Sequence, residues 1–188
     1  MYSEIWQRDG QTLTNPIVTY GDLQLEEHDE VCDALTTLLA DLFALYVKTK
    51  VFHWHVSGLS SHGGHLVLAE QADKVLMTID TIGERVRALG GTPIRSIGEI
   101  SRLHWIGDRA SADPTVREML AALLRDSRMI AKQMRRNYAL CSAHGDFASA
   151  RLLEDWIDEA EGRYWFLFEM HATIEGRRRI SGSGVKQR

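Results

Sequence analysis

The chain has few prolines, few cysteines and no long apolar run, and each of these features limits the classes of fold or site that it can form. Only 3 of its 188 residues are proline, which leaves room for long uninterrupted helices. The two cysteines, Cys32 and Cys141, have no metal-ligand spacing, so we expect buried, reduced thiols in a reducing compartment. No stretch approaches the roughly 18 consecutive apolar residues of a membrane span. The opening MYSEIWQRDG lacks the features of a signal peptide, so we expect a cytoplasmic protein.

Charge is spread unevenly along the chain. The formal net charge is −4, which argues against a protein that binds nucleic acid over its whole surface. Residues 173–188 carry five cations and one acid, a balance of +4, so the remainder of the chain carries −8. The cations of this segment are Arg177, Arg178, Arg179, Lys186 and Arg188, and its acid is Glu175. An acidic body with a basic tail is therefore expected.

Apolar residues recur at three- and four-residue spacing in four long segments, which is the period of an amphipathic helix. These segments cover about 23–56, 61–89, 113–140 and 147–175. In the second segment the apolar residues at this spacing include Leu66 and Leu76. We divide the chain into an N-terminal arm (1–21), a helical bundle (22–176) and a flexible basic tail (177–188).

Local signals mark the ends of these helices. Gly90-Gly91 with Pro93 behind them ends the second helix, and Asp113-Pro114 is the expected start of the third. The connection between these two helices is long, and a short helix is expected within it at 100–107. One long connection between two helix pairs is typical of ferritin-like bundles. We therefore predict an all-α fold, a ferritin-like four-helix bundle with a short helix in the long connection between helices two and three.

The segment VFHWHVSGLSSHGGHLVLAE, residues 51–70, holds four of the eight histidines, and Asp80 and Glu84 follow one turn apart. Imidazole and carboxylate are ligands that suit iron, zinc and manganese. His65 and Asp80 differ by only about 60° around a helix but lie about 22 Å apart along it, so one metal cannot bridge them. The turn at Ser57-Gly58 can return His53 beside His65. A two-fold axis would then bring Asp80 and Glu84 from a second copy.

The more usual site inside a single bundle uses Glu-x-x-His motifs, and the chain contains none. This absence leaves two interpretations from the residues alone, a site shared between two subunits or no metal site. His55 and His62 are expected to be surface groups or groups that support the ligands.

Together the motifs resemble one known family. HWHVSG at 53–58, His65, the Asp-x-x-x-Glu of Asp80 and Glu84, and ERVRALGGTP at 84–93 resemble the core of the Dps family (DNA-binding proteins from starved cells, or mini-ferritins). The order of the helices and the short middle helix extend the likeness over most of 23–175.

The resemblance implies a hollow homododecamer, built from two-fold dimers, that protects DNA from oxidative damage. Such a cage oxidises Fe²⁺ with hydrogen peroxide at sites between subunits and stores the Fe³⁺ product inside. By position, iron would be held by His53, His65, Asp80 and Glu84. Trp54 would lie beside the site, where family members place a tryptophan that intercepts radicals; packing at an interface is the alternative for this residue.

One position departs from the family pattern. An aspartate is expected four residues after the second histidine, and this chain has Ala69 there. Glu70 points about 100° further round the helix and Asp73 lies two turns from His65, so neither replaces it. Loss of this anion should weaken Fe²⁺ binding, of a second iron in particular, unless His55 or His62 compensates.

These observations leave three hypotheses. The first is the iron-oxidising and iron-storing cage. The second is a DNA-compacting or structural cage with an impaired iron centre, in which Arg177, Arg178, Arg179, Lys186 and Arg188 bind DNA phosphates without sequence preference and place the protein at the nucleoid. A tail that only keeps the cage soluble is the alternative for those cations. The third is a protein that binds zinc or another divalent metal through the same ligands.

Overall fold

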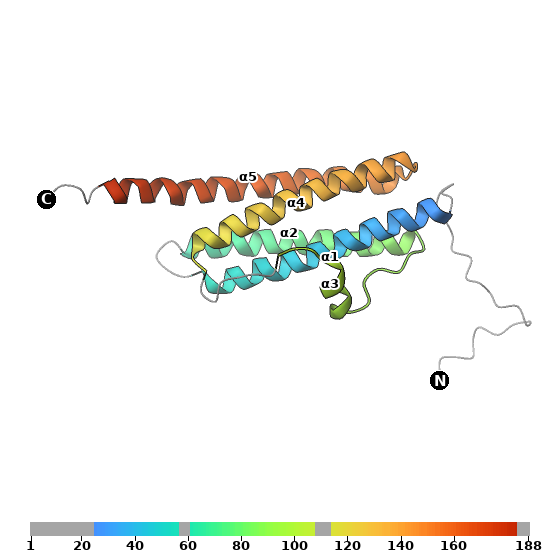
Figure 1. Ribbon diagram of the computed structural model, residues 1–188, viewed down its shortest axis with the longest axis horizontal. Helices are drawn as coiled ribbons and strands as arrows, with labels where there is room; N and C mark the ends of the chain where they lie inside the picture. The colour runs from blue at the N-terminus through green and yellow to red at the C-terminus, as the bar shows by residue number, and fades with distance from the viewer. Residues whose placement is uncertain (1–24, 57–60, 108–113, 184–188) are drawn as a thin grey trace, which may run out of the picture.

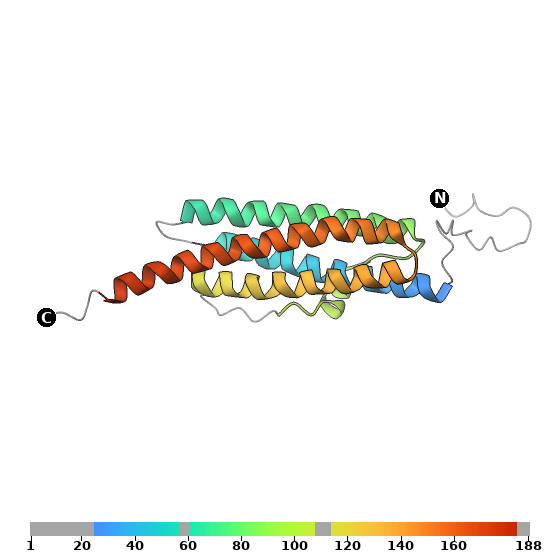
Figure 2. The ribbon, with the colours of Figure 1, turned by 90° about the horizontal axis from the view of Figure 1, so that it is seen from above.

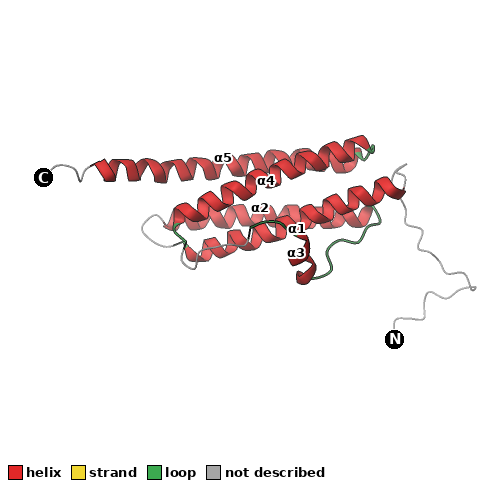
Figure 3. Ribbon diagram, viewed as in Figure 1, coloured by secondary structure: helices red, strands yellow, loops and turns green. Residues whose placement is uncertain are grey.

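Five helices and no strand make up the part of the chain that the computed structural model describes, residues 25–56, 61–107 and 114–183 (Figures 1 and 3). The helices are α1 (Leu25–His55), α2 (Ser61–Ala88), α3 (Ile97–Leu103), α4 (Val116–Ala143) and α5 (Phe147–Ser183). The four long helices form two pairs, α1 with α2 and α4 with α5, and the short α3 lies against α1 (Figures 1 and 2). The predicted all-α bundle is confirmed.

The core lies between the two pairs. Four leucines on α1, at three- and four-residue spacing, are buried: Leu35, Leu38, Leu42 and Leu45. Burying each contributes about 1.5–3 kcal/mol relative to exposure, so packing of this stripe holds the bundle together. Cys32 and Cys141 are also buried free thiols, as predicted, and burial raises their pKa to about 11 and about 12.

An ion pair locks the end of α2 to the start of α5. The Arg85 guanidinium donates to Asp146 Oδ1 at 2.6 Å and to Ser149 Oγ at 2.7 Å. The same Asp146 oxygen accepts the Ser149 backbone N–H at 3.1 Å and so caps the first turn of α5. Because Glu84 precedes Arg85, this contact also fixes the rotation of the segment that carries the candidate acids.

Two helix starts differ from the sequence-based expectation. The short helix begins at Ile97 rather than 100, because Ser96 accepts the Glu99 N–H and the Glu99 carboxylate accepts the Arg95 N–H. The third long helix begins at Val116, because Thr115 and Glu118 form a capping box. The expected cap, Asp113, lies outside the described residues.

The last helix is longer than expected. α5 continues to Ser183, past the end near Glu175 that the sequence indicated, so 177–183 are helical rather than part of a flexible tail. A glycine such as Gly176 inside a helix destabilises it by only about 1 kcal/mol relative to alanine. No proline follows Gly176 to remove a backbone hydrogen bond. The final part of α5 projects beyond the other helices (Figures 1 and 2). The predicted arm at 1–21 and residues 184–188 lie outside the described residues. No helix in the described ranges is long and apolar enough to cross a membrane.

The long connection is attached to α1 through a buried carboxylate. Asp41 is completely buried, and its Oδ1 accepts the Trp105 backbone N–H at 2.9 Å. Its Oδ2 has no partner among the described residues, and neither does Oε1 of the neighbouring Gln133. Burial raises the pKa of Asp41 above its ordinary value of 3.8, although the Trp105 hydrogen bond partly offsets this.

A pH dependence of stability follows from this carboxyl group. Because its pKa is higher in the folded state, the folded protein binds more protons than the unfolded chain once the pH exceeds about 3.8. The free energy of unfolding should therefore fall, relative to that of Asp41→Asn, as the pH rises through this window, and then level off. Urea unfolding of both proteins over an acid-to-neutral pH series measures this. If the free energy of unfolding of the wild type instead rose relative to that of Asp41→Asn as the pH increased, the assignment would be contradicted.

Candidate metal centre

The turn between α1 and α2 brings two of the predicted ligands together. The imidazole rings of His53 and His65 have centroids 4.9 Å apart and meet edge to face, at 87°. A Cβ at Gly64 would lie 3.3 Å from Val56 Cγ1, so the absence of a side chain at this position permits the close approach of the two helices. The prediction that His53 and His65 lie side by side agrees with the geometry.

A backbone hydrogen bond sets the tautomer of one histidine. His53 Nδ1 lies 3.0 Å from the carbonyl oxygen of His65, and a carbonyl oxygen only accepts, so Nδ1 carries the proton. The Nε2 lone pair is then available to a metal ion. Metal-binding histidines are usually oriented in this way, by donating their other ring N–H to a carbonyl or carboxylate. The two imidazoles at this end of α2 therefore suit a divalent transition-metal ion.

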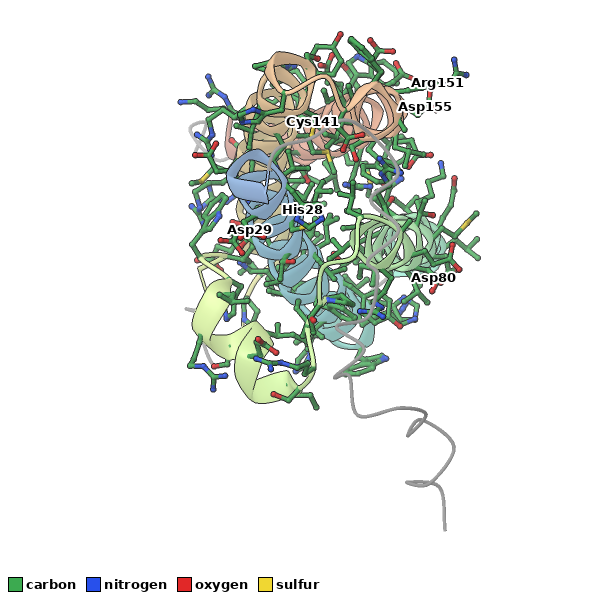
Figure 4. All side chains as sticks on the ribbon, turned by 90° about the vertical axis from the view of Figure 1, so that its right-hand side faces the viewer. His28, Asp29, Asp80, Cys141, Arg151 and Asp155 are labelled. Carbon is green, nitrogen blue, oxygen red and sulfur yellow. The ribbon has the colours of Figure 1, made fainter. Side chains whose placement is uncertain are left out.

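The two predicted acids lie at the other end of α2. Asp80 and Glu84 are exposed, and Figure 4 shows Asp80 at the outer edge of the molecule. Fifteen residues of helix separate His65 from Asp80, about 22 Å. Within the described part of one chain, no group of three or more His, Cys, Asp and Glu side chains can hold a metal ion. One subunit thus carries two candidate half-sites, a histidine pair and a carboxylate pair.

Neither His55 nor Glu70 adds a ligand to the histidine pair in one chain. His55 is exposed, and its Nδ1 donates to the Val51 carbonyl at 2.7 Å. The side chain of His62 is outside the described residues. Ala69 is partly buried one turn beyond His65, and Glu70 is turned to an ion pair with Lys74 at 2.8 Å. The gap in the ligand pattern at position 69 is therefore not filled by the neighbouring glutamate.

Five large apolar side chains are exposed on α1 and α2, the helices that carry both candidate half-sites. We call them the outer apolar face: Val47, Trp54, Leu66, Leu76 and Met77 are between 43 and 73% exposed. Leu66 and Leu76 fit the apolar period of the sequence, yet both are exposed. The signal in the sequence was that α2 has apolar residues on more than one side, so a single core stripe could not account for all of them.

The chain is similar to ferritin-like and Dps proteins. The model of the ferritin-like domain family matches residues 32–176. A low temperature-induced protein of Nostoc is 32% identical over 153 residues, covering 81% of this chain and 84% of the relative. DNA protection during starvation protein 1 of Deinococcus radiodurans is 26% identical over 156 residues, covering 83% and 75%. The crystal structure of an archaeal Dps homologue from Halobacterium salinarum superposes with a TM-score of 0.77 at 26% identity, covering 87% and 93%.

Proposed function

This chain belongs to the Dps branch of the ferritin-like family, and we propose that it is a cage protein that oxidises Fe²⁺ with hydrogen peroxide and stores the Fe³⁺ product. The observation that carries the proposal is the paired histidines, with His53 held in the tautomer that offers Nε2 to a metal. Iron is the substrate and the cargo of this reaction. Two Fe²⁺ ions each give one electron to hydrogen peroxide, which takes up two protons and leaves as two water molecules.

Each site is shared between two subunits in this proposal. An antiparallel arrangement of α2 from two copies places the His53 and His65 of one copy opposite Asp80 and Glu84 of the other, and the two-fold axis generates two equivalent sites. The carboxylates supply the negative charge that a cation requires, and the imidazoles supply neutral donors. Burial of the outer apolar face stabilises the same dimer, because it removes exposed Met77 and Leu66 from water.

The shared site also gives the tryptophan of the motif a redox role. Trp54 follows His53 directly and is 66% exposed in one chain, on the outer apolar face. In the shared site it sits at the edge of the iron centre, where it can give up an electron to a radical before the radical escapes. Packing in the dimer interface accounts equally for its exposure, and both roles are compatible.

The twelve-subunit cage extends this dimer. Self-assembly into cages is a property of Dps homologues, and six two-fold dimers complete the homododecamer. Cytoplasmic location is part of the same proposal, supported by the two buried free thiols, Cys32 and Cys141.

The test of the proposed activity is peroxide-driven oxidation of Fe²⁺, followed by absorbance of the ferric product. The wild type should oxidise iron rapidly and retain the product as a mineral core, whereas the double variant His65→Ala, Asp80→Ala should not. Equal rates for the two proteins would refute the proposal. Metal analysis of the purified protein separates iron from zinc or another divalent ion at the same ligands.

A second candidate function is a DNA-compacting or structural cage with a weakened iron centre. Ala69 favours it, because the position where an anionic ligand is expected holds a methyl group. The basic segment favours it as well. Arg177, Arg178 and Arg179 lie on the part of α5 that projects beyond the bundle (Figure 1), and Lys186 and Arg188 follow outside the described residues. Many such segments on one cage would bind DNA with avidity.

Deleting residues 177–188 should abolish salt-sensitive retardation of duplex DNA by the assembled protein. Each phosphate that a cation neutralises contributes about 0.9 to the slope of log affinity against log salt, so removing five cations has a large effect. The measurement is a gel shift over a series of salt concentrations. If the truncated protein retards duplex DNA as strongly as the full chain does, residues 177–188 are not the DNA-binding segment.

A further inference from the structure

One cation lies inside the bundle without an anion beside it. Arg163 is on the core side of α5, between Ala160 and Leu167, and it is only 6% exposed. Among the described residues it is the one lysine or arginine that is buried. Its Nε and Nη1 are buried and have no hydrogen-bond partner in that part of the chain. None of the ion pairs within the described ranges includes Arg163.

This guanidinium remains charged at neutral pH. Burial lowers the pKa of Arg163 from 12.5 to about 10, and the charge of Glu159 partly offsets this effect. Glu159 lies one turn earlier on α5, and it is exposed rather than buried with the arginine. A buried carboxyl group becomes neutral by taking up a proton, whereas an arginine does not lose its proton in a protein. An isolated charge in the interior is strongly destabilising unless an opposite charge accompanies it.

Other cations that reach into the bundle are neutralised by carboxylates. Lys48 Nζ lies 2.5 Å from Asp126 Oδ2, and Arg85 Nη2 lies 2.6 Å from Asp146 Oδ1. Both carboxylates are buried. Arg163 has no such partner among the described residues, so an anion taken from solution is the simplest source of the missing charge.

A buried hydroxyl lies at the same level of the bundle as Arg163. Ser127 on α4 is completely buried, and its Oγ has no partner among the described residues. The residues that follow these two in the chain, Arg128 and Tyr164, line one hollow on the outer side of α4 and α5. Ser127 and Arg163 are therefore level with one another on the core side of the same helix pair. A serine hydroxyl can donate a hydrogen bond to an anion.

A buried amide reaches this level from the other helix pair. Arg85 Nε donates to Ser149 Oγ at 2.7 Å, and α2 and α5 run antiparallel (Figures 1 and 2). Gln71 and Arg163 each lie 14 residues from this contact, about 21 Å along their helices. Gln71 is buried, and its Oε1 has no partner in the described part of the chain. The amide is neutral, so it can accept an N–H of Arg163 but cannot compensate the charge.

We propose that Arg163 binds one small monovalent inorganic anion, of the size of chloride or nitrate, inside the helical bundle. The guanidinium supplies the positive charge and N–H donors, and the Ser127 hydroxyl supplies a further donor. Burial strips water from the ion, and the cost of this step rises steeply with charge, so a monovalent anion suits the site better than phosphate.

The anion site goes beyond the proposed function and is independent of assembly. It lies within one subunit, between α2, α4 and α5, so it does not depend on which outer faces a dimer or a cage covers. The candidate iron ligands and residues 177–188 contribute nothing to it. Each site can therefore be tested while the other is intact.

The test is unfolding of the full-length, assembled protein over a range of chloride concentrations, with gluconate replacing chloride to keep the ionic strength constant. An anion that binds only the folded state lowers the unfolding equilibrium constant in proportion to its concentration, once this exceeds the dissociation constant. For the wild type, a tenfold rise in chloride should therefore lower that constant about tenfold. Arg163→Met keeps an unbranched side chain without the charge and should show no dependence, whereas Arg163→Lys should retain it.

A matched control removes a cation from the surface of the same helix. Arg151 is exposed, and Figure 4 shows it at the outer edge of the molecule, so Arg151→Met should keep the wild-type chloride dependence. Ser127→Ala loses one donor to the anion. In that variant the chloride concentration at which the dependence begins should rise about fivefold, the effect of one hydrogen bond.

Crystals of the wild type grown in bromide locate the ion, because bromide gives an anomalous peak. The peak should lie within hydrogen-bond distance of the Arg163 guanidinium and be absent from Arg163→Met. The proposal is overturned if the wild type shows no chloride dependence, or if Arg163→Met shows the same dependence. A carboxylate of the chain, such as that of Glu159, in place of bromide would also overturn it. Fe²⁺ oxidation by Arg163→Met should stay at the wild-type rate, so failure here leaves the proposed iron activity untouched.

Discussion

Two inactive variants should restore iron oxidation when they are assembled together. His65→Ala removes a ligand from the histidine half-site, and Asp80→Ala removes one from the carboxylate half-site. Each variant alone should be at least about 100-fold slower, because even groups that only support a metal ligand are worth 10- to 100-fold. In a mixed dimer one site carries both substitutions, and the other has every ligand intact.

The size of the recovery follows from the two-fold symmetry. Half of the dimers in an equal, random mixture are mixed, and half of the sites in a mixed dimer are intact, so about a quarter of wild-type activity should return. The two variants are dissociated, mixed and reassembled, and peroxide-driven Fe²⁺ oxidation is compared with that of each variant treated alone. Glu154→Ala, which removes an exposed acid from α5, is the control for loss of charge. A mixture no more active than its components would exclude a site shared between His65 and Asp80.

Ala69→Asp should tighten Fe²⁺ binding by about tenfold or more and accelerate oxidation. Position 69 lies one turn beyond His65 on α2 and is partly buried, so an aspartate there adds an anionic oxygen beside the histidine pair. The gain should be larger for a second iron than for the first, because the second lacks a ligand in the native chain. Anaerobic calorimetric titration with Fe²⁺ measures affinity and stoichiometry, and the oxidation assay measures the rate.

The matched control for this prediction is Ala69→Asn, which has nearly the same size and no charge. It should give little of the gain, since a neutral amide is a much weaker ligand for a divalent cation than a carboxylate. If Ala69→Asp binds and oxidises Fe²⁺ as the wild type does, the native centre does not need an acid at position 69. His62→Ala then identifies the compensating ligand, because that variant should bind Fe²⁺ more weakly only if His62 takes the place of the missing aspartate.

The existence of the long helices could be predicted, because their signals are local. The apolar period marked all four long helices, and the glycines at 90 and 91 marked the end of α2. The capping box of Thr115 and Glu118 was also present in the sequence, beside the competing signal of Asp113-Pro114. The end of α5 could not be predicted from Gly176, since one glycine weakens a helix without ending it.

Faces of helices were less predictable than their ends. Leu66 and Leu76 fit the period of a buried stripe, yet both are exposed, because only the position of the neighbouring helix decides which apolar side is covered.

The sequence by itself determined the helical bundle, the choice of His53, His65, Asp80 and Glu84 as candidate ligands, and the impossibility of one chain joining them along a single helix. Helical rise and the chemistry of side chains are properties of neighbouring residues, so no structure was needed for these conclusions. Only the tertiary structure decided that the His65 carbonyl keeps the proton of His53 on Nδ1 and that Asp41 holds the long connection. Those facts depend on contacts between residues distant in the chain, and packing of the whole bundle sets such contacts.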